Sequence, residues 1–272
     1  AWAMGYSEPG AGSDLASLNT RAVKEGDHYR INGSKMWTSD ATLCDYIFVL
    51  VRTSPEKPKH EGISLMLVDM RQPGVTVSPI QLISGASPFC ETHFSDAVVP
   101  LEDVIGGIDR GWTVGKRLLQ FERSTHAGIN ISGSQGGRSE KSQMPALVAR
   151  YVSSQAGQLS DPALRRWLTE FEMNSHAQRI TQRRAIEELS SRAPGFTSSA
   201  VKLTNALNIQ DGDELLVAAM GSQGLRWDPE TADADELAAL QKWLYQKSLT
   251  IAGGTKEVQL NIIAKRVLGL PD

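Results

Sequence analysis

The sequence predicts an α+β protein in which an antiparallel β-barrel or sandwich is followed by an up-down bundle of helices. Short apolar segments, separated by Gly, Pro, Asn and Asp turns, fill the part of the chain before Pro100, a spacing typical of an antiparallel barrel or sandwich. From Gly111 onward apolar residues recur at helical spacing instead. Short connections between these amphipathic segments indicate an antiparallel bundle.

The expected strands either alternate apolar and polar residues or are short and continuously apolar. They cover residues 18–23, 28–31, 46–51, 63–68, 75–82 and 91–94. Because the pattern changes near residues 100–110, we expect a β domain over residues 1–105 and a helical domain over residues 106–272.

The first expected helix runs from Trp112 to beyond Ile129. A second begins at Asp161, where a capping side chain and the following proline are typical of a helix N-terminus. Further helices are expected over residues 198–220, 235–249 and 256–268.

Composition limits the classes of partner and site. The 28 basic and 31 acidic side chains leave a formal charge of -3, so no positive field is expected to attract nucleic acid or an anionic membrane. The apolar runs are far shorter than the roughly 20 residues that cross a bilayer, and we expect a cytoplasmic protein. Two cysteines and five histidines show no metal-ligand spacing, so no metal site is predicted.

Two segments of the β part could bind a ligand. The loop Ser7–Asp14 is rich in Gly and hydroxyl residues, and its backbone N–H groups could meet a ligand's acceptors, although a tight turn explains the same composition. It has neither the Rossmann nor the P-loop order of glycines. Trp37 stands beside the hydroxyls of Thr38 and Ser39, where a flat cofactor could stack, although such a ring is usually part of a core.

Glu122 is the most unusual residue of the first expected helix. It follows Leu118 and Leu119 by four and three residues, so a carboxylate lies on the apolar stripe where a leucine belongs. Burial raises a carboxyl pKa, which suits a general base for a weakly acidic C–H proton. A core glutamate paired with Arg117 or Arg123 fits the same pattern, and both interpretations stay open on periodicity alone.

The segment Ile251–Thr255 is a Gly-containing break between two expected helices, and Thr255 is a suitable N-cap for the second of them. Backbone N–H groups at such a break suit an anionic ligand or a developing oxyanion. A plain helix–helix turn is the alternative.

Four linked segments carry a family resemblance. They are Tyr6–Asp14 (YSEPGAGSD), Ile31–Ser39 (INGSKMWTS), parts of Phe94–Gly106, and Gly253–Gln259 (GGTKEVQ) with Ile262–Arg266. In this order they resemble the acyl-CoA dehydrogenase family along nearly the whole chain. The resemblance implies a flavoprotein with FAD as cofactor, which oxidises an acyl-CoA thioester to its 2,3-enoyl product in fatty acid and lipid metabolism. It also implies a homo- or hetero-oligomer, such as a homotetramer, that passes electrons to an electron-transfer flavoprotein.

The resemblance implies three domains, of which the middle β domain and the C-terminal bundle are present in this sequence. A leading helical domain of about a hundred residues would precede them. We therefore expect either that the sequence is a fragment or that another polypeptide supplies those helices.

The resemblance also assigns residues to the site. The expected flavin contacts are Met4, Tyr6, Ser7, Trp37, Thr38, Ser39, Thr255 and Glu257. The expected substrate contacts are Ser13, Phe121, Arg123 and Gly254.

The position of the catalytic base differs between branches of the family. Many members carry it as a glutamate in the loop before the final helix, where this chain has Gly253. In other branches the base lies in a Glu-Arg pair on the preceding long helix, which Glu122 and Arg123 resemble. The resemblance thus implies that Glu122 removes the α-proton and that the Gly253 N–H, with a flavin ribityl hydroxyl, holds the thioester oxygen.

Two segments that bind the dinucleotide in the family are weak here. An Arg-x-x-Phe-Gly segment has no clear match between Ser134 and Val152, and a Gln-x-x-Gly-Gly-x-Gly segment is reduced to Met220–Gly224. Residues 161–166 instead resemble bacterial members associated with bulky acyl groups such as sterol side chains. One alternative is therefore a non-catalytic partner subunit of a heteromeric acyl-CoA dehydrogenase. The other is a flavin oxidase or monooxygenase of the same fold.

Overall fold

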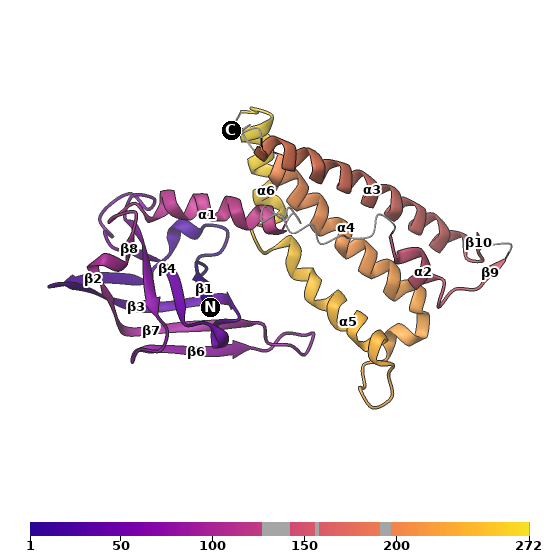
Figure 1. Cartoon of the computed structure of the whole chain (residues 1–272), viewed down its shortest axis with the longest axis horizontal. Coiled ribbons are helices and arrows are strands. Elements are labelled where there is room, and N and C mark those ends of the chain that lie inside the picture. The colour runs from indigo at the N-terminus through magenta and orange to yellow at the C-terminus, as the bar shows by residue number, and fades with distance from the viewer. Residues whose placement is uncertain (127–141, 156–157, 191–196, 272) are drawn as a thin grey trace. The chain divides into compact units, whose positions relative to one another are not determined.

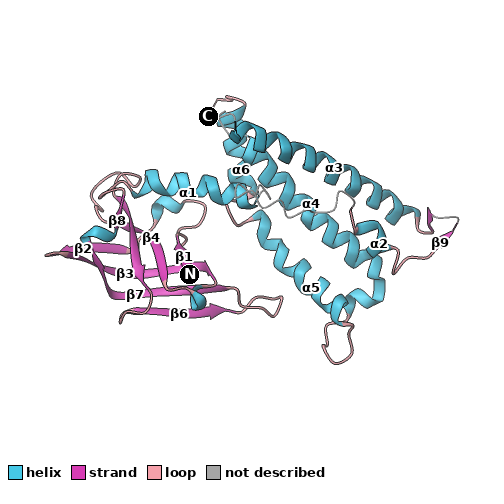
Figure 2. Cartoon of the chain, in the orientation of Figure 1, coloured by secondary structure: helices cyan, strands magenta, loops and turns pink. Residues whose placement is uncertain are grey.

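The computed structural model describes residues 1–126, 142–155, 158–190 and 197–271 (Figure 1). The chain divides into two compact units, Ala1–Gln120 and Phe121–Asp272. The sheet lies in the first unit, and the second unit contains the long helices α3 (Pro162–Ser190), α4 (Thr197–Met220) and α5 (Ala234–Gln246) (Figure 2). The predicted α+β class, with the β domain first and the helical bundle second, is confirmed. A domain boundary between residues 105 and 106 stays a prediction.

The first unit is built on one mixed sheet. Its strands are β1 (Trp2–Gly5), β2 (Arg21–Glu25), β3 (His28–Ser39), β4 (Tyr46–Arg52), β5 (Ile63–Asp69), β6 (Val75–Ile80), β7 (Phe89–Pro100) and β8 (Val104–Ile105). They follow the order β6-β7-β3-β2-β4-β5-β8, and β1 pairs with β4 outside this path. The β1 and β2 pairings with β4 are parallel, while the remaining pairings are antiparallel.

Strand β3 is longer than the sequence pattern indicates. The expected strand ends at Ile31 because the Asn-Gly pair that follows is typical of a turn. Instead β3 continues to Ser39, and its pairing with β7 shifts register between Ile31 and Gly33 and again between Lys35 and Thr38. The first shift absorbs the Asn-Gly pair without a reversal of the chain.

Two apolar clusters form the core of the first unit. One contains inward residues of β2, β3, β4, β5 and β7. The other lies around Tyr6, Leu18, Leu50 and Leu65, and the N-terminal half of α1 (Gly111–His126) packs against it through Trp112, Val114, Leu118 and Leu119. The predicted apolar stripe of this helix is therefore confirmed.

A carboxylate at Asp109 anchors the start of α1. It accepts hydrogen bonds from Thr53 Oγ1 at 2.7 Å, Ser54 Oγ at 2.9 Å and Lys57 Nζ at 2.7 Å, and its own N–H donates to Ser64 Oγ at 2.8 Å. Burial raises the pKa of Asp109, but these donors outweigh it and the pKa lies below its usual value. The entry into α1 is thus fixed to the β4–β5 hairpin.

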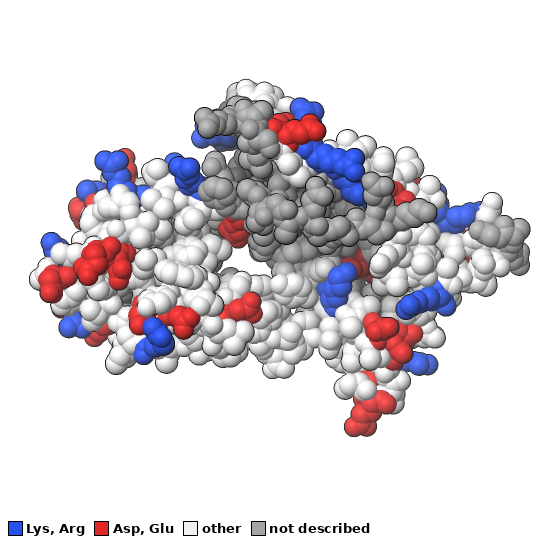
Figure 3. Space-filling model, in the orientation of Figure 1, with Lys and Arg blue, Asp and Glu red and all other residues white. Residues whose placement is uncertain are grey.

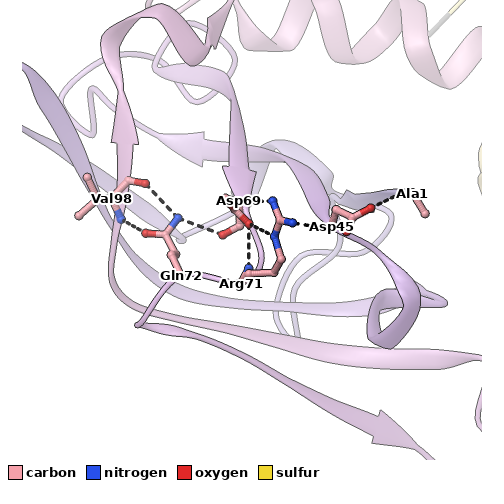
Figure 4. Close-up of polar contacts among 6 residues, drawn as sticks. All are labelled: Ala1, Asp45, Asp69, Arg71, Gln72 and Val98. Carbon is pink, nitrogen blue, oxygen red and sulfur yellow. Dashed lines mark hydrogen bonds and ion pairs between the residues drawn. The ribbon is translucent and has the colours of Figure 1, made fainter.

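A second polar network secures the turn after β5 (Figure 4). Asp69 accepts hydrogen bonds from the Arg71 backbone N–H at 2.9 Å and from its Nε at 3.1 Å. Gln72 donates to the carbonyls of Asp69 and Val98 and accepts from the Val98 N–H at 2.7 Å. The amide therefore joins the end of β5 to β7.

The second unit contains a bundle around α4. Its elements are α2 (Met144–Val148), β9 (Ser154–Gln155), β10 (Gln158–Leu159), α3 (Pro162–Ser190), α4 (Thr197–Met220), α5 (Ala234–Gln246) and α6 (Lys256–Ile262). Helix α4 contacts α2, α3, α5 and α6. The expected helix over residues 235–249 ends in a 3₁₀ turn at Lys247–Thr250, and the one over residues 256–268 ends in a π-helical turn at Ile263–Val267.

The described residues carry mixed charges on the face that Figure 3 shows, where acidic and basic side chains are interspersed. None of the helices in the described ranges is long and apolar enough to span a bilayer. The same residues contain no cluster of three or more His, Cys, Asp or Glu side chains that could bind a metal.

Candidate active site

The Gly-rich loop is folded back onto β3. Glu8 and Ala11 exchange backbone hydrogen bonds of 3.0 Å in both directions, which closes a tight turn. The Ser7 carbonyl accepts from the Met36 N–H at 2.8 Å, so Ser7 lies beside the strand residue that precedes Trp37. Two of the residues expected at the flavin are thereby brought together.

A buried ion pair holds this loop. Lys35 is fully buried, and its Nζ donates to Glu8 Oε1 at 2.7 Å and to the Tyr6 carbonyl at 3.1 Å. Glu8 also accepts from the N–H groups of Asn19 at 2.6 Å and Thr20 at 2.9 Å. These four bonds attach the loop to β3 and to the start of β2. Glu8 and Lys35 both lie within segments of the family resemblance, but the sequence predicts no role for either.

The ion pair shifts the two pKa values differently. Burial lowers the pKa of Lys35 to about 8, although the charge of Glu8 opposes this change. Burial raises the pKa of Glu8, but the charge and hydrogen bond of Lys35, with the bonds from Thr20 and Asn19, outweigh it and leave the pKa below its usual value. The carboxylate is better compensated than the ammonium group because it also accepts two backbone N–H groups.

Trp37 lies on a strained part of β3. Its φ of +64° is in the left-handed region, which a bulky residue adopts at a cost of the order of 1–3 kcal/mol. The indole is 52% exposed and meets Phe89 edge-on at 6.2 Å. Thr38 is buried, with its hydroxyl 3.3 Å from Thr92 Oγ1, and Ser39 is exposed. The second register shift of β3 thus turns Trp37 outward and the Thr38 hydroxyl inward.

An exposed ring held in a strained conformation, next to the Ser39 hydroxyl and the anchored Ser7 loop, fits a flat aromatic cofactor such as a flavin. Met4 and the Tyr6 ring lie further inside, against the second apolar cluster, where Tyr6 meets Phe48 edge-on at 6.0 Å. The side chains of Met4 and Tyr6 therefore pack in the core beneath the loop, and both residues are also expected flavin contacts.

Ser13 is exposed in the loop segment after the Glu8–Ala11 turn. The expected substrate contacts Phe121 and Arg123 lie in α1, of which the structure describes the backbone at these positions. Residues 134–141 of the segment compared with the Arg-x-x-Phe-Gly motif lie outside the described residues.

Glu122 lies on the face of α1 that also carries Leu118 and Leu119. Its side chain is half-buried, and its Oε2 atom is excluded from solvent.

The break between α5 and α6 has a defined conformation. Gly253 and Gly254 have left-handed φ values of +66° and +99°. The Gly253 carbonyl accepts from Gln259 Nε2 at 3.0 Å, and the Gly254 carbonyl accepts from Lys202 Nζ at 2.6 Å. Within the described part of the chain, the N–H groups of Gly253, Gly254 and Thr255 donate no hydrogen bond. These three donors are therefore available to an external acceptor.

Thr255 caps α6, because its hydroxyl accepts from the Val258 N–H at 3.3 Å, and the predicted N-cap is confirmed. Glu257 is exposed in the first turn of α6. The residues expected near this loop are thus adjacent, whereas Lys202 and Gln259, which hold it, were not identified from the sequence. No sequence signal marks either residue, because Lys202 follows Ser198 and Ser199 on its helix face and Gln259 follows Thr255 and Lys256 on its own.

Two family models match the chain and define its class as an acyl-CoA-oxidising flavoprotein fold. The acyl-CoA dehydrogenase middle domain matches residues 3–97, and the acyl-CoA dehydrogenase C-terminal domain matches residues 109–268. The chain therefore belongs to the acyl-CoA dehydrogenase family, whose members are oxidoreductases and flavoproteins that use FAD.

Individual relatives agree with this membership. The chain is 38% identical to the acyl-CoA dehydrogenase IpdE1 of Mycobacterium tuberculosis, over 99% of this chain and 67% of that protein. It is 34% identical to the acyl-CoA dehydrogenase FadE34 of the same organism, of which it covers 35%. The solved structure called Tcur3481-Tcur3483 steroid ACAD gives a TM-score of 0.83 at 33% identity, over 99% of this chain and 68% of that chain. The ChsE4-ChsE5 complex from Mycobacterium tuberculosis gives 0.79 at 28% identity, over 100% and 69%.

Proposed function

We propose that the chain acts as an FAD-dependent acyl-CoA dehydrogenase, which converts an acyl-CoA thioester to the 2,3-enoyl-CoA. The observation that carries the proposal is Glu122, a half-buried carboxylate on the apolar face of α1 with one oxygen excluded from solvent. In the family branch that this sequence resembles, a glutamate on this helix is the base.

The flavin would be held by Trp37 through its exposed ring, by Ser39 through its hydroxyl and by the backbone of the Ser7 loop. Thr38 would contribute its backbone, because its hydroxyl is directed to Thr92. Met4, Tyr6, Thr255 and Glu257 complete the proposed contacts. When bound, FAD accepts the hydride that leaves the β-carbon of the substrate.

The protein's own groups act on the α-carbon and on the thioester. Glu122 accepts the α-proton, and the negative charge that develops moves to the thioester oxygen. The Gly253 N–H would donate to that oxygen, and its neighbour Gly254 would contact the thioester. Arg123 and Phe121 flank Glu122 in α1 and would orient it and the acyl group, while Ser13 would meet the CoA side of the substrate.

The comparisons support a bulky substrate and an oligomer. Because one similar structure is called a steroid ACAD, we propose a steroid-derived acyl-CoA as the substrate class. The two-chain names Tcur3481-Tcur3483 and ChsE4-ChsE5 support assembly with a second chain. An electron-transfer flavoprotein is the proposed electron acceptor.

The same two-chain relatives favour a second candidate, a non-catalytic partner subunit. The reduced segment Met220–Gly224, which lies at the end of α4 and in the 3₁₀ turn that follows, is the feature of this chain that agrees with it. In that role the chain would supply flavin contacts while another chain supplies the base.

Anaerobic titration with a steroid acyl-CoA separates the two candidates. The FAD-loaded protein should lose its visible flavin absorption, and Glu122→Gln should keep the flavin but show no such bleaching. Glu170→Gln, a control at an exposed position of α3, should bleach like the wild type. Bleaching by Glu122→Gln would overturn the assignment of the base, and a colourless purified protein would favour the partner subunit.

A further inference from the structure

We infer that Lys202 and Gln259 are positioning residues of the Gly253–Thr255 loop, because they hold its two glycine carbonyls and thereby fix the Gly254 and Thr255 N–H groups beside the Gly253 N–H, the proposed donor to the thioester oxygen. This inference rests on the proposed function, and it adds two residues to which no role had been given.

Both donors are buried. Lys202 is 2% exposed on α4, and its Nζ donates to the carbonyls of Gly254 at 2.6 Å and Leu249 at 3.2 Å. Gln259 is fully buried in α6, and its Nε2 donates to the Gly253 carbonyl at 3.0 Å. Because water does not compete for these bonds, they fix the orientation of the peptide groups more firmly than surface contacts would.

Because each peptide group is planar, a bond that fixes a carbonyl also fixes the direction of the N–H group in the same peptide. In a trans peptide the C=O and the following N–H point to opposite sides. The described chain has no cis peptide bonds, so the N–H of Gly254 points away from Gln259 and the N–H of Thr255 points away from Lys202. The two carbonyls are thus turned into the bundle, and the two N–H groups are turned away from their buried partners.

The conformation requires glycine at the centre of the loop. Gly254 has a φ of +99°, and a Cβ built there would lie 2.6 Å from Gln259 Nε2. The side chain of Gln259 therefore fills the space that any other residue at position 254 would need. The position of the Gln259 side chain therefore depends on glycine at position 254.

Helix α4 also supports the segment that leads into the loop. Gln210 Nε2 donates to the carbonyls of Gln246 at 2.9 Å and Lys247 at 3.3 Å. With Lys202 bound to Leu249 and Gly254, two side chains of α4 hold the connection from the end of α5 to the loop. The positive charge of Lys202 further polarises the peptide group that it binds, which strengthens the Thr255 N–H as a donor.

A purely structural role is the alternative, in which the bonds only close the bundle. Gln259→Met separates the two roles, because the Gln259 Oε1 atom accepts no hydrogen bond from any described residue. The substitution leaves the Gly253 carbonyl without its donor, but it also removes the unsatisfied Oε1 atom, which offsets part of this cost, so the variant should still fold. Lys202→Met is the stronger variant, and Gln259→Met keeps the test valid if Lys202→Met fails to fold.

Two CoA conjugates of one steroid side chain serve as probes for the FAD-loaded protein. One is a thioester with sulfur in place of the β-carbon, which keeps the carbonyl but cannot be oxidised, and the other is the matching S-alkyl thioether without the carbonyl. We expect Gln259→Met and Lys202→Met to weaken binding of the thioester by about tenfold and to leave the thioether unchanged.

The matched control is Lys242→Met, which removes a lysine from the 3.2 Å contact with Asp213 between α5 and α4 and should leave both dissociation constants unchanged. Equal weakening of both probes by the loop variants, or no weakening, would overturn the inference. A wild-type protein that binds neither probe would overturn the proposed function instead.

A measurement without any CoA ligand tests the positioning step alone. NMR order parameters of the Gly254 and Thr255 N–H bonds should be lower in Gln259→Met than in the wild type and unchanged in Lys242→Met, because the loop would then sample other orientations. Unchanged order parameters in Gln259→Met would overturn the positioning role whatever the substrate is.

Discussion

Replacement of Lys35 by methionine tests the ion pair that holds the Gly-rich loop. Methionine fills a similar volume but removes the Nζ that donates to Glu8 and to the Tyr6 carbonyl. The Glu8 carboxylate, itself only 8% exposed, would keep the N–H groups of Asn19 and Thr20 but lose its cation.

Two opposing contributions set the magnitude. Removal of one partner from a buried ion pair costs about 3–5 kcal/mol, because the remaining charge is uncompensated. The lysine itself carries a burial penalty, since its pKa falls from 10.5 to about 8, which corresponds to about 3 kcal/mol. The 3–5 kcal/mol is a net cost that already includes this penalty, so we expect Lys35→Met to lower the free energy of unfolding by about 3–5 kcal/mol at pH 7. Glu8→Gln combined with Lys35→Met should recover at least half of that loss.

The pH dependence follows from the direction of the same shift. Between pH 8 and 10.5 the unfolded chain retains the Lys35 proton and the folded chain does not, so the wild type gains stability as the pH rises. The gain should approach about 3 kcal/mol relative to the double variant, in which neither group ionises. Glu8 acts at the other end of the range, because its lowered pKa stabilises the fold above its ordinary value and this contribution is lost in acid.

Urea unfolding followed by circular dichroism at pH 7 and across pH 8–10.5 measures these differences. Lys24→Met, an exposed lysine of β2, is the control and should change neither the stability nor its pH dependence. A loss below about 1 kcal/mol for Lys35→Met, a double variant no more stable than the single one, or a flat pH comparison would refute the reasoning.

Three further outcomes are expected. Gly254→Ala should lower the free energy of unfolding by about 2–4 kcal/mol, because backbone strain adds to the close contact of the new Cβ with Gln259. Gly269→Ala is the control, since Gly269 also has a positive φ but open space around it, and it should cost about 1 kcal/mol. Thermal unfolding of both variants measures the difference. Asp109→Asn should reduce the loss of stability that the wild type shows below about pH 4, because the lowered pKa of Asp109 stabilises the fold above that range. Urea unfolding from pH 2 to 6 measures the free energy of unfolding, and the same pH dependence in both proteins would contradict the lowered pKa. Trp37→Ala should weaken FAD binding about tenfold or more in a fluorescence titration, and wild-type affinity would remove this residue from the flavin contacts.

The sequence predicts features that depend on local pattern. Strands β4, β5 and β6, the apolar stripe of α1 and the Thr255 cap follow from residues within a few positions of one another, which periodicity and capping rules describe well. Strands β1 and β8 were not predicted. The strained backbone at Trp37 was not predictable, because the register shift that produces it depends on the pairing of β3 with β7.

The burial of two lysines was not predicted from the sequence, for a different reason. Lysine is almost never fully buried, so the default expectation for Lys35 and Lys202 is a solvated side chain. The acceptors that make burial possible, Glu8 and the Gly254 carbonyl, lie 27 and 52 residues away in the chain. Lys35 on β3 and Lys202 on α4 hold two loops that the sequence predicts as candidate ligand sites, and only the fold shows what holds those loops.

The left-handed backbone at Gly253 limits which residues this loop could carry. An L-residue with a φ near +66° costs about 1–2 kcal/mol relative to glycine, so a glutamate could not enter this loop without strain or a new conformation. Transfer of the proposed base from Glu122 to the loop would therefore need at least two changes, one that supplies the carboxylate and one that relaxes the backbone. The carbonyl bond to Gln259 opposes the second change, so the present loop conformation favours keeping the carboxylate on α1.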